Sequence, residues 1–408
     1  MILSVISSFA FGFLIDKAKN KKIPLGISIA VSLSFLIYFK YSNFCIDNTN
    51  VLLGTDFSLL KLVLPIGISF YTFQTISYNI DLYRGNAKLQ KNIINYACYV
   101  SFFPQLIAGP IVRYSIIEDQ LKNRTHSWEN FSQGAQRFTI GLSKKVLLAN
   151  ILGEFCEKYV DSSEKTMVFA IFYAVAYSVQ IYLDFSAYSD MAIGMGKMFG
   201  FTFPENFNYP FTAKSVTDFW RRWHMTLGTW FRDYVYIPLG GNRVSKLLWF
   251  RNIIIVWLLT GFWHGAEWNF IIWGLYFAVF LILEKIFLLD FFKKIPSFFS
   301  HIYLILVTLV SFLIFASSDM SFLSETLGVL GGSSGIINPE TAYYIRSYAV
   351  AFVLGIFACT PVLKKLVLKH KDKKIIQVLS PVCIAVLLCV TSSLLIAGSA
   401  DPFLYFRF

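Results

Sequence analysis

The stretch MVFAIFYAVAYSVQIYLDFSA, residues 167–187, decides the class of fold. It matches the roughly 20 apolar residues that a helix needs to cross the hydrocarbon core of a bilayer. Comparable apolar runs recur at residues 24–39, 62–80, 96–112, 247–262, 270–283, 302–316, 344–360 and 375–397. We therefore predict an all-α, polytopic transmembrane helical bundle of about nine to eleven spans, with re-entrant or tilted pieces among the shorter runs.

The composition also indicates a membrane protein. Of 408 residues, 56% are hydrophobic and 15% are charged, whereas an ordinary soluble domain has about 25% charged residues. The net charge is +12, and a membrane protein usually carries such an excess in short cytoplasmic loops. We therefore predict that the chain contacts membrane lipids and binds no nucleic acid. We expect residues 1–408 to form a single integral-membrane domain.

The distribution of charge predicts which loops lie inside the cell. The basic segment KKLVLKHKDKK, residues 364–374, is expected in the cytoplasm. Because spans alternate in direction, the loop at residues 317–341 is then expected outside and the basic residues 285–294 inside. The segment at residues 43–56 has two acids and no base, so it is expected outside.

Residues 184–190, DFSAYSD, place two carboxylates at the end of a strongly apolar run. On a helix Ser186 and Asp190 lie at positions i and i+4, so they share one face. An ionisable group is costly in lipid, and neighbouring hydroxyls can satisfy a buried acid. We therefore predict an inward-facing polar stripe that includes Asp184. The alternative is a helix end whose carboxylates stand in water.

Residues 219–224, FWRRWH, place a histidine among tryptophans and arginines. A cap at Ser215 or Thr217 and the acid Asp218 predict a helix that begins near Asp218 and continues past His224. Such a helix would stack aromatic rings around the imidazole. The alternative is an amphipathic helix in the headgroup region, with its arginines reaching water.

Residues 261–265, GFWHG, contain a second histidine, His264, 40 positions after His224. The two glycines permit close backbone approach or a break between two apolar helices. Imidazole exchanges a proton near neutral pH, so His264 could accept the proton of a hydroxyl that attacks a thioester carbonyl. A second group or a tryptophan N–H could stabilise the oxyanion. The alternative is a hydrogen-bonded structural histidine.

Other chemistries have less support. No serine stands in a GxSxG elbow and no cysteine stands near a histidine, which leaves an acyl-imidazole as the covalent option. The six cysteines show no CxxC spacing. His264 and Glu267 would supply at most two of the three protein ligands that a catalytic zinc needs. We therefore predict no metal site and no bound cofactor.

Six motifs, in order along the chain, resemble the membrane-bound O-acyltransferase (MBOAT) family and, within it, the alginate O-acetylation membrane proteins. They lie at residues 64–71 (LPIGISFY), 103–110 (FPQLIAGP), 184–192 (DFSAYSDMA), 219–224 (FWRRWH), 232–243 (RDYVYIPLGGNR) and 261–265 (GFWHG). The resemblance implies a ring of helices around a central funnel. The family usually has further apolar helices before the region that residues 1–15 match, so we expect a chain that is short at its N-terminus.

The resemblance also implies the roles of the site residues. The family's essential histidine falls on His264, as catalytic base or transient acyl acceptor. Its second active-site position falls on His224, which would assist or position the acyl group. The predicted residues of the substrate pocket are Trp223, Arg222, Asp233 and Trp263. The residues predicted to support this pocket are Asp184, Ser186, Asp190 and Asn206.

A multi-pass enzyme of the bacterial plasma membrane is the function that the resemblance implies. It would take an acyl group, here acetyl, from a cytoplasmic thioester such as acetyl-CoA and pass it outward for O-acetylation of a cell-surface polysaccharide. It would share the last step with an extracytoplasmic O-acetyltransferase and with polysaccharide synthesis and export proteins. The alternatives are a flippase for a lipid-linked glycan, D-alanyl transfer to teichoic acid, and a scaffold without catalysis.

Overall fold

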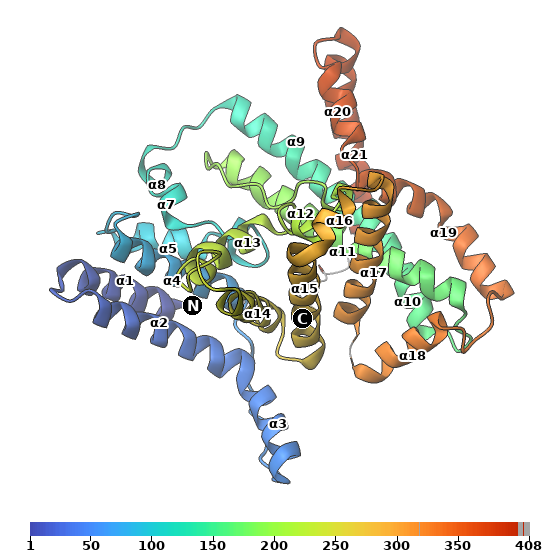
Figure 1. The fold of residues 1–408 in the computed structure, drawn as a ribbon. Coiled ribbons are helices and arrows are strands. Elements are labelled where there is room, and N and C mark those ends of the chain that lie inside the picture. The colour runs from blue at the N-terminus through green and yellow to red at the C-terminus, as the bar shows by residue number, and fades with distance from the viewer. Residues whose placement is uncertain (318, 399–402, 404–408) are drawn as a thin grey trace.

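A computed structural model describes residues 1–317, 319–398 and 403 of the chain, and every regular element among them is helical (Figure 1). The prediction of an all-α, polytopic bundle is confirmed. Among the described residues, seven helices are long and apolar enough to cross a membrane. They are Lys22–Leu53, Met167–Met198, Lys246–His264, Trp268–Phe292, Ser297–Ala316, Pro339–Ala358 and Lys374–Ile396.

The first part of the chain packs around α4 (Ile68–Arg84), which α1 (Ile2–Lys17) and α2 (Lys22–Leu36) cover. The side-chain amide of Asn79 on α4 donates hydrogen bonds to Ser8 Oγ at 2.9 Å and to Ser28 Oγ at 2.6 Å. Polar contacts of this kind join helices in a membrane. The other elements here are the π-helical turn η1 (Ile37–Tyr41), α3 (Ser42–Leu53), α5 (Ile93–Ser101), α6 (Phe103–Leu106), α7 (Tyr114–Ile117) and α8 (Gln120–Asn123).

Two of the apolar runs do not form single spans, so fewer long helices are present than the sequence predicts. The run at 62–80 is non-helical up to Gly67, whose φ of 74° precedes the start of α4. The run at 96–112 is divided between α5 and α6, where Pro104 stands in the first turn of α6. Proline and a left-handed glycine both interrupt helices, which explains the difference.

The centre of the molecule is α11 (Met167–Met198), which packs against α9 (Trp128–Lys144), α10 (Asn150–Asp161) and the π-helical turn η2 (Lys145–Ala149). The most apolar window of α11 is 67% buried, whereas that of α21 (Lys374–Ile396) is 6% buried, so α11 is an interior helix. A Cβ added at Gly134 of α9 would lie 2.5 Å from the carbonyl oxygen of Gly194 on α11. The two backbones therefore touch directly.

The next part carries both motif histidines. It comprises η3 (Pro210–Thr212), α12 (Val216–Trp220), α13 (Met225–Phe231), η4 (Arg232–Tyr236), α14 (Lys246–His264), α15 (Trp268–Leu283), η5 (Glu284–Leu288) and α16 (Leu289–Phe292). A Cβ at Gly261 of α14 would lie 2.2 Å from the carbonyl oxygen of Phe270, and one at Gly274 of α15 would lie 2.3 Å from that of Trp257. These two glycines allow α14 and α15 to pack backbone to backbone.

The last part comprises α17 (Ser297–Ala316), α18 (Met320–Leu330), α19 (Pro339–Ala358), α20 (Val362–Lys369) and α21. Figure 1 shows the turn between α20 and α21 at one end of the molecule and α3 at the opposite end. The basic segment 364–374 covers most of α20 and this turn, and the acidic segment 43–56 covers most of α3 and the residues after it. Their separation agrees with the charge pattern that predicts them on opposite sides of a membrane.

Candidate active site

A cavity of about 40 Å³ lies beside the end of α14 and receives His264, the last residue of that helix. Its other lining residues come from the segment after α6, from α11, α15 and α17, from the segment before α13 and from the C-terminal tail. The residues that line it are Ala108, Ile181, Asp184, Phe185, Tyr188, Trp223, His264, Trp273, Phe312, Phe315 and Phe403. His264, Trp223 and Asp184 of the predicted site therefore meet at one cavity.

Aromatic rings surround the imidazole of His264. The ring centroids of Trp263, Trp273 and Phe315 lie at 5.0, 5.1 and 5.4 Å from that of His264, each in an edge-to-face arrangement. These rings keep the space around the imidazole largely apolar, and electrostatic interactions are stronger where water is excluded. A neutral imidazole here is poised to exchange a proton with a group in the cavity.

The second histidine is close to the first, because both imidazoles contact the indole of Trp263. The centroid distance from Trp263 is 5.9 Å for His224 and 5.0 Å for His264. Trp263 is 2% exposed and its indole N–H donates to the carbonyl oxygen of Ser69 at 3.4 Å. Trp263 thus contacts both histidines, while its N–H donates to the backbone of α4.

The predicted helix through His224 is wrong. α12 ends at Trp220, and α13 begins only at Met225. His224 itself has φ 43° and ψ 52°, a left-handed conformation that is uncommon for a non-glycine residue and costs energy. The backbone N–H of Met225 donates to the carbonyl oxygen of Asn206 at 2.9 Å. This contact from a neighbouring segment holds the chain in the break.

The side chain of Asn206 determines which nitrogen of His224 carries the proton. Its Oδ1 accepts from the backbone N–H of Thr226 at 3.3 Å, and its Nδ2 donates to Ser189 Oγ at 3.1 Å. Oδ1 must therefore be the oxygen that faces His224 Nδ1, 3.1 Å away, and Nδ1 must donate. In a neutral ring the other nitrogen is then an acceptor. His224 Nε2 is buried and has no hydrogen-bond partner among the described residues.

Trp273 is a site residue that sequence reasoning missed. It lines the cavity with His264 and is 1% exposed, yet its indole N–H has no hydrogen-bond partner in the described part of the chain. A buried tryptophan N–H usually has a partner, so this donor is available to a ligand. The residue lies inside the apolar run 270–283. The one sequence signal for it is the presence of a tryptophan among hydrophobic side chains.

A buried layer of charges supports the cavity from α9 and η2. Asp184 pairs with Lys145 at 2.7 Å, and both side chains are under a tenth exposed. Asp190 pairs with Lys144 at 2.6 Å, and Lys144 also donates to Ser186 Oγ at 2.9 Å. The predicted polar stripe of α11 is thus paired with basic residues of α9 and η2. The sequence sign of these partners is the lysine pair in the otherwise apolar segment LSKKVLLA, residues 142–149.

Two predicted pocket residues lie elsewhere. Arg222 pairs with Asp218 at 3.0 Å, and Asp233 pairs with Arg113 at 2.8 Å. Neither Arg222 nor Asp233 is among the described residues that line the cavity, and neither are Trp263 and His224. Burial opposes the ionisation of Asp233, but hydrogen bonds from Arg232 and Arg113 outweigh it and lower the pKa of this carboxyl. The ion pair at Asp233 is therefore a structural tie to the segment before α7.

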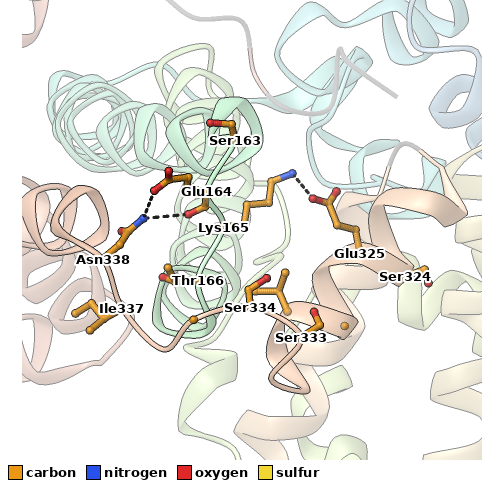
Figure 2. Close-up of a pocket in the computed structure, with 13 residues that line it drawn as sticks. Ser163, Glu164, Lys165, Thr166, Ser324, Glu325, Ser333, Ser334, Ile337 and Asn338 are labelled. Carbon is orange, nitrogen blue, oxygen red and sulfur yellow. Dashed lines mark hydrogen bonds and ion pairs between the residues drawn. The ribbon is translucent and has the colours of Figure 1, made fainter.

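A larger, polar cavity of about 630 Å³ lies between the start of α11, α18 and the loop after α18 (Figure 2). Lys165 pairs with Glu325 at 3.0 Å across it, and the amide of Asn338 donates to the Glu164 carboxylate at 3.3 Å. The described residues that line it include no histidine. It therefore lacks the imidazole that lines the cavity at His264.

Comparisons with known proteins show which proteins this chain is similar to. The MBOAT, membrane-bound O-acyltransferase family, matches residues 87–324, which include both histidines. A probable alginate O-acetylase of Azotobacter vinelandii is 38% identical over 94% of this chain and 84% of its own length. A peptidoglycan O-acetyltransferase of Helicobacter pylori is 40% identical over 65% of this chain, and the match spans 56% of that protein. A teichoic acid D-alanyltransferase of Bacillus subtilis is 30% identical over 56% of the chain and 60% of its own length.

Proposed function

Because this chain belongs to the membrane-bound O-acyltransferase family, we propose that it takes an acetyl group from a cytoplasmic thioester and passes it outward for O-acetylation of a cell-surface polysaccharide. The chain is a multi-pass membrane O-acyltransferase. The donor would be acetyl-CoA or another acyl thioester, bound as substrate. The membrane would be the bacterial plasma membrane, and an extracytoplasmic O-acetyltransferase with polysaccharide synthesis and export proteins would complete the pathway.

The observation that carries this proposal is the imidazole of His264 in a small aromatic cavity. As an acceptor hydroxyl attacks the thioester carbonyl, His264 takes the hydroxyl proton. The C–O bond forms, the C–S bond breaks, and the proton passes from the imidazolium to the departing thiolate. The unpartnered N–H of Trp273 is a suitable donor to the oxyanion that develops on the carbonyl oxygen.

His224 would have a different role from His264. Its Nδ1 proton is committed to Asn206, so its Nε2 can only accept a hydrogen bond while the ring is neutral. An acceptor cannot stabilise an oxyanion. His224 would instead orient a donor group of a substrate, such as a hydroxyl or an amide N–H of the thioester carrier, next to the acyl group.

The size of the cavity favours acetyl over a longer acyl group. A cavity needs roughly 10–15 Å³ to hold a water molecule, so about 40 Å³ holds a few atoms. An acetyl group is of this size. The single carboxylate among the described lining residues, Asp184, is paired with Lys145, which leaves no obvious counter-ion for the ammonium of a D-alanyl group.

The test is replacement of His264 by alanine, with surface-polymer O-acetyl content measured at matched protein level in the native host. We expect O-acetylation to be lost. The matched control is His370→Ala, which removes a histidine from the turn after α20 and should leave O-acetylation unchanged. Full O-acetylation in the His264→Ala strain would contradict the proposal.

A further inference from the structure

The π-helical turn η1 places two adjacent side chains, Lys40 and Tyr41, against the end of the helix that carries His264. Lys40 Nζ donates to the carbonyl oxygen of Trp263 at 2.6 Å and to that of His264 at 3.0 Å. Tyr41 donates its hydroxyl proton to the carbonyl oxygen of Phe262 at 2.7 Å. More than two hundred residues separate η1 from this helix end in the sequence, so the contact is a tertiary one.

These contacts complete the hydrogen bonding of α14. The last four carbonyl groups of a helix have no partner within the helix, and at membrane depth each must find another. The carbonyl of Gly261 accepts from the N–H of Gly265 at 3.4 Å. The carbonyls of residues 262, 263 and 264 accept from Tyr41 and Lys40. Of the last four carbonyls of α14, one therefore accepts from the backbone N–H of Gly265, and the two side chains of η1 provide donors for the other three.

The same turn is fixed to its surroundings on other sides. The ring of Tyr41 stacks on that of Phe262, with centroids 4.0 Å apart. Lys40 Nζ also donates to Ser69 Oγ at 3.2 Å, at the start of α4. An ammonium group has three donors, and Lys40 uses three acceptors. Its charge also suits the carboxyl end of a helix, which carries a partial negative charge.

We propose that Lys40, with Tyr41, is a positioning residue for acyl transfer: it caps α14 and so sets the place of the His264 imidazole in the cavity. This inference rests on the function proposed above. Because all three ammonium protons of Lys40 have acceptors in the protein, Lys40 does not act on the substrate directly. π-Helical turns inside α-helices occur frequently at functional sites. Here the turn η1 places the side chains of Lys40 and Tyr41 against the C-terminal end of α14.

The test compares Lys40→Met with wild type in native membranes, with labelled acetyl-CoA as donor and with protein amount and thermal stability measured in the same preparations. Methionine keeps the apolar stem and removes the charge and the donors. We expect kcat to fall roughly 10-fold to 100-fold, as a displaced catalytic group costs, with KM for the donor nearly unchanged. Lys40→Arg retains a charged donor, and we expect it to recover part of the lost kcat.

The matched control is Lys165→Met, which also removes a lysine whose side chain is 11% exposed and ion-paired, but at the polar cavity of Figure 2. Its kcat should stay within twofold of wild type. If Lys40→Met is poorly folded, Tyr41→Phe removes a single hydroxyl and should lower kcat by about threefold to tenfold, in line with one lost hydrogen bond.

Two outcomes would overturn the inference. One is an unchanged kcat in Lys40→Met at matched protein amount. The other is a loss that follows only the loss of folded protein and that Lys40→Arg does not relieve. Failure of the proposed function itself is distinguishable, because wild-type membranes would then transfer no label, or His264→Ala membranes would transfer as much as wild type.

Discussion

His224 and Asn206 form a hydrogen bond of 3.1 Å whose direction is set by a third group, the backbone N–H of Thr226, which occupies the same amide oxygen. The proton on His224 therefore lies on Nδ1, and Nε2 is the nitrogen that is left to accept a bond. This arrangement assigns different tasks to the two histidines of the site. His264 exchanges a proton, whereas His224 accepts a hydrogen bond from a donor group that it orients.

The first prediction concerns this pair. Asn206→Ala removes the acceptor of the Nδ1 proton, so the ring can rotate or change tautomer, and a mispositioned group costs up to about 100-fold in rate. We expect acyl transfer to fall by at least about 10-fold. Ser189→Ala removes the other partner of the same amide and should cost less. Equal rates in wild type and Asn206→Ala would show that acyl transfer does not depend on the hydrogen bond that fixes the Nδ1 proton of His224.

The second prediction concerns the indole N–H of Trp273. Trp273→Phe keeps an aromatic ring in the cavity wall but removes the donor, and loss of one oxyanion donor costs about 100-fold to 1,000-fold in kcat. We expect a fall of this order, measured as acetyl transfer from labelled acetyl-CoA.

Trp220→Phe is the matched control for Trp273→Phe. The indole N–H of Trp220 is also buried without a partner in the described part of the chain, but Trp220 does not appear among the described residues that line the cavity. Its replacement should leave kcat nearly unchanged. If both variants lose the same activity, the effect comes from aromatic packing, and Trp273 has no role at the oxyanion.

The third prediction concerns the buried ion pair of Asp184 and Lys145. Removal of one partner leaves an uncompensated charge and destabilises a protein by about 3–5 kcal/mol. We expect Lys145→Met to lower the unfolding temperature of the detergent-solubilised protein clearly. The double variant Lys145→Met with Asp184→Leu, which removes both charges, should unfold at a higher temperature than the single variant. A double variant that unfolds at a lower temperature than Lys145→Met alone would contradict the pairing.

The fourth prediction concerns the close contact of α14 and α15. In Gly261→Ala, the new methyl group would lie 2.2 Å from the carbonyl oxygen of Phe270, so the two helices must move apart and His264 with them. We expect less folded protein and lower activity per folded molecule. Gly26→Ala is the control, because nothing lies within 4 Å of a Cβ at that position of α2. Wild-type behaviour of Gly261→Ala would show that the helices do not need this contact.

Much of the helical architecture could be predicted from the sequence, because apolar length alone indicates a span. Residues 167–187 predicted α11, and its interior position agrees with the acids that it carries. The break at His224 could not be predicted in this way. The local sequence FWRRWHMTLGTWF, residues 219–231, has no proline before the break, and the left-handed backbone of His224 is held by Asn206 from a separate segment.

The partners of the site were harder to predict than its motif residues. Lys40 stands alone in an apolar run, and its contact with the carbonyls of residues 263 and 264 depends on the path of η1 past α14. In the sequence, nothing distinguishes Trp273 from a tryptophan of the core. In the structure, it lines the cavity with His264 and its N–H has no acceptor among the described residues. Both assignments depend on tertiary contacts that periodicity and spacing do not contain.

As proposed above, His264 is the base for the transfer by which an acetyl group leaves a cytoplasmic thioester on its way to a polysaccharide outside the membrane. The most direct measurement uses inside-out membrane vesicles of the native host, which keep the polymer and the partner proteins, and supplies labelled acetyl-CoA to the exposed cytoplasmic face. We predict that label enters the luminal polymer as base-labile ester with wild-type protein and that it does not with His264→Ala. Equal labelling in both, or movement of a glycolipid without any transfer of label, would contradict acetyl transfer that depends on His264.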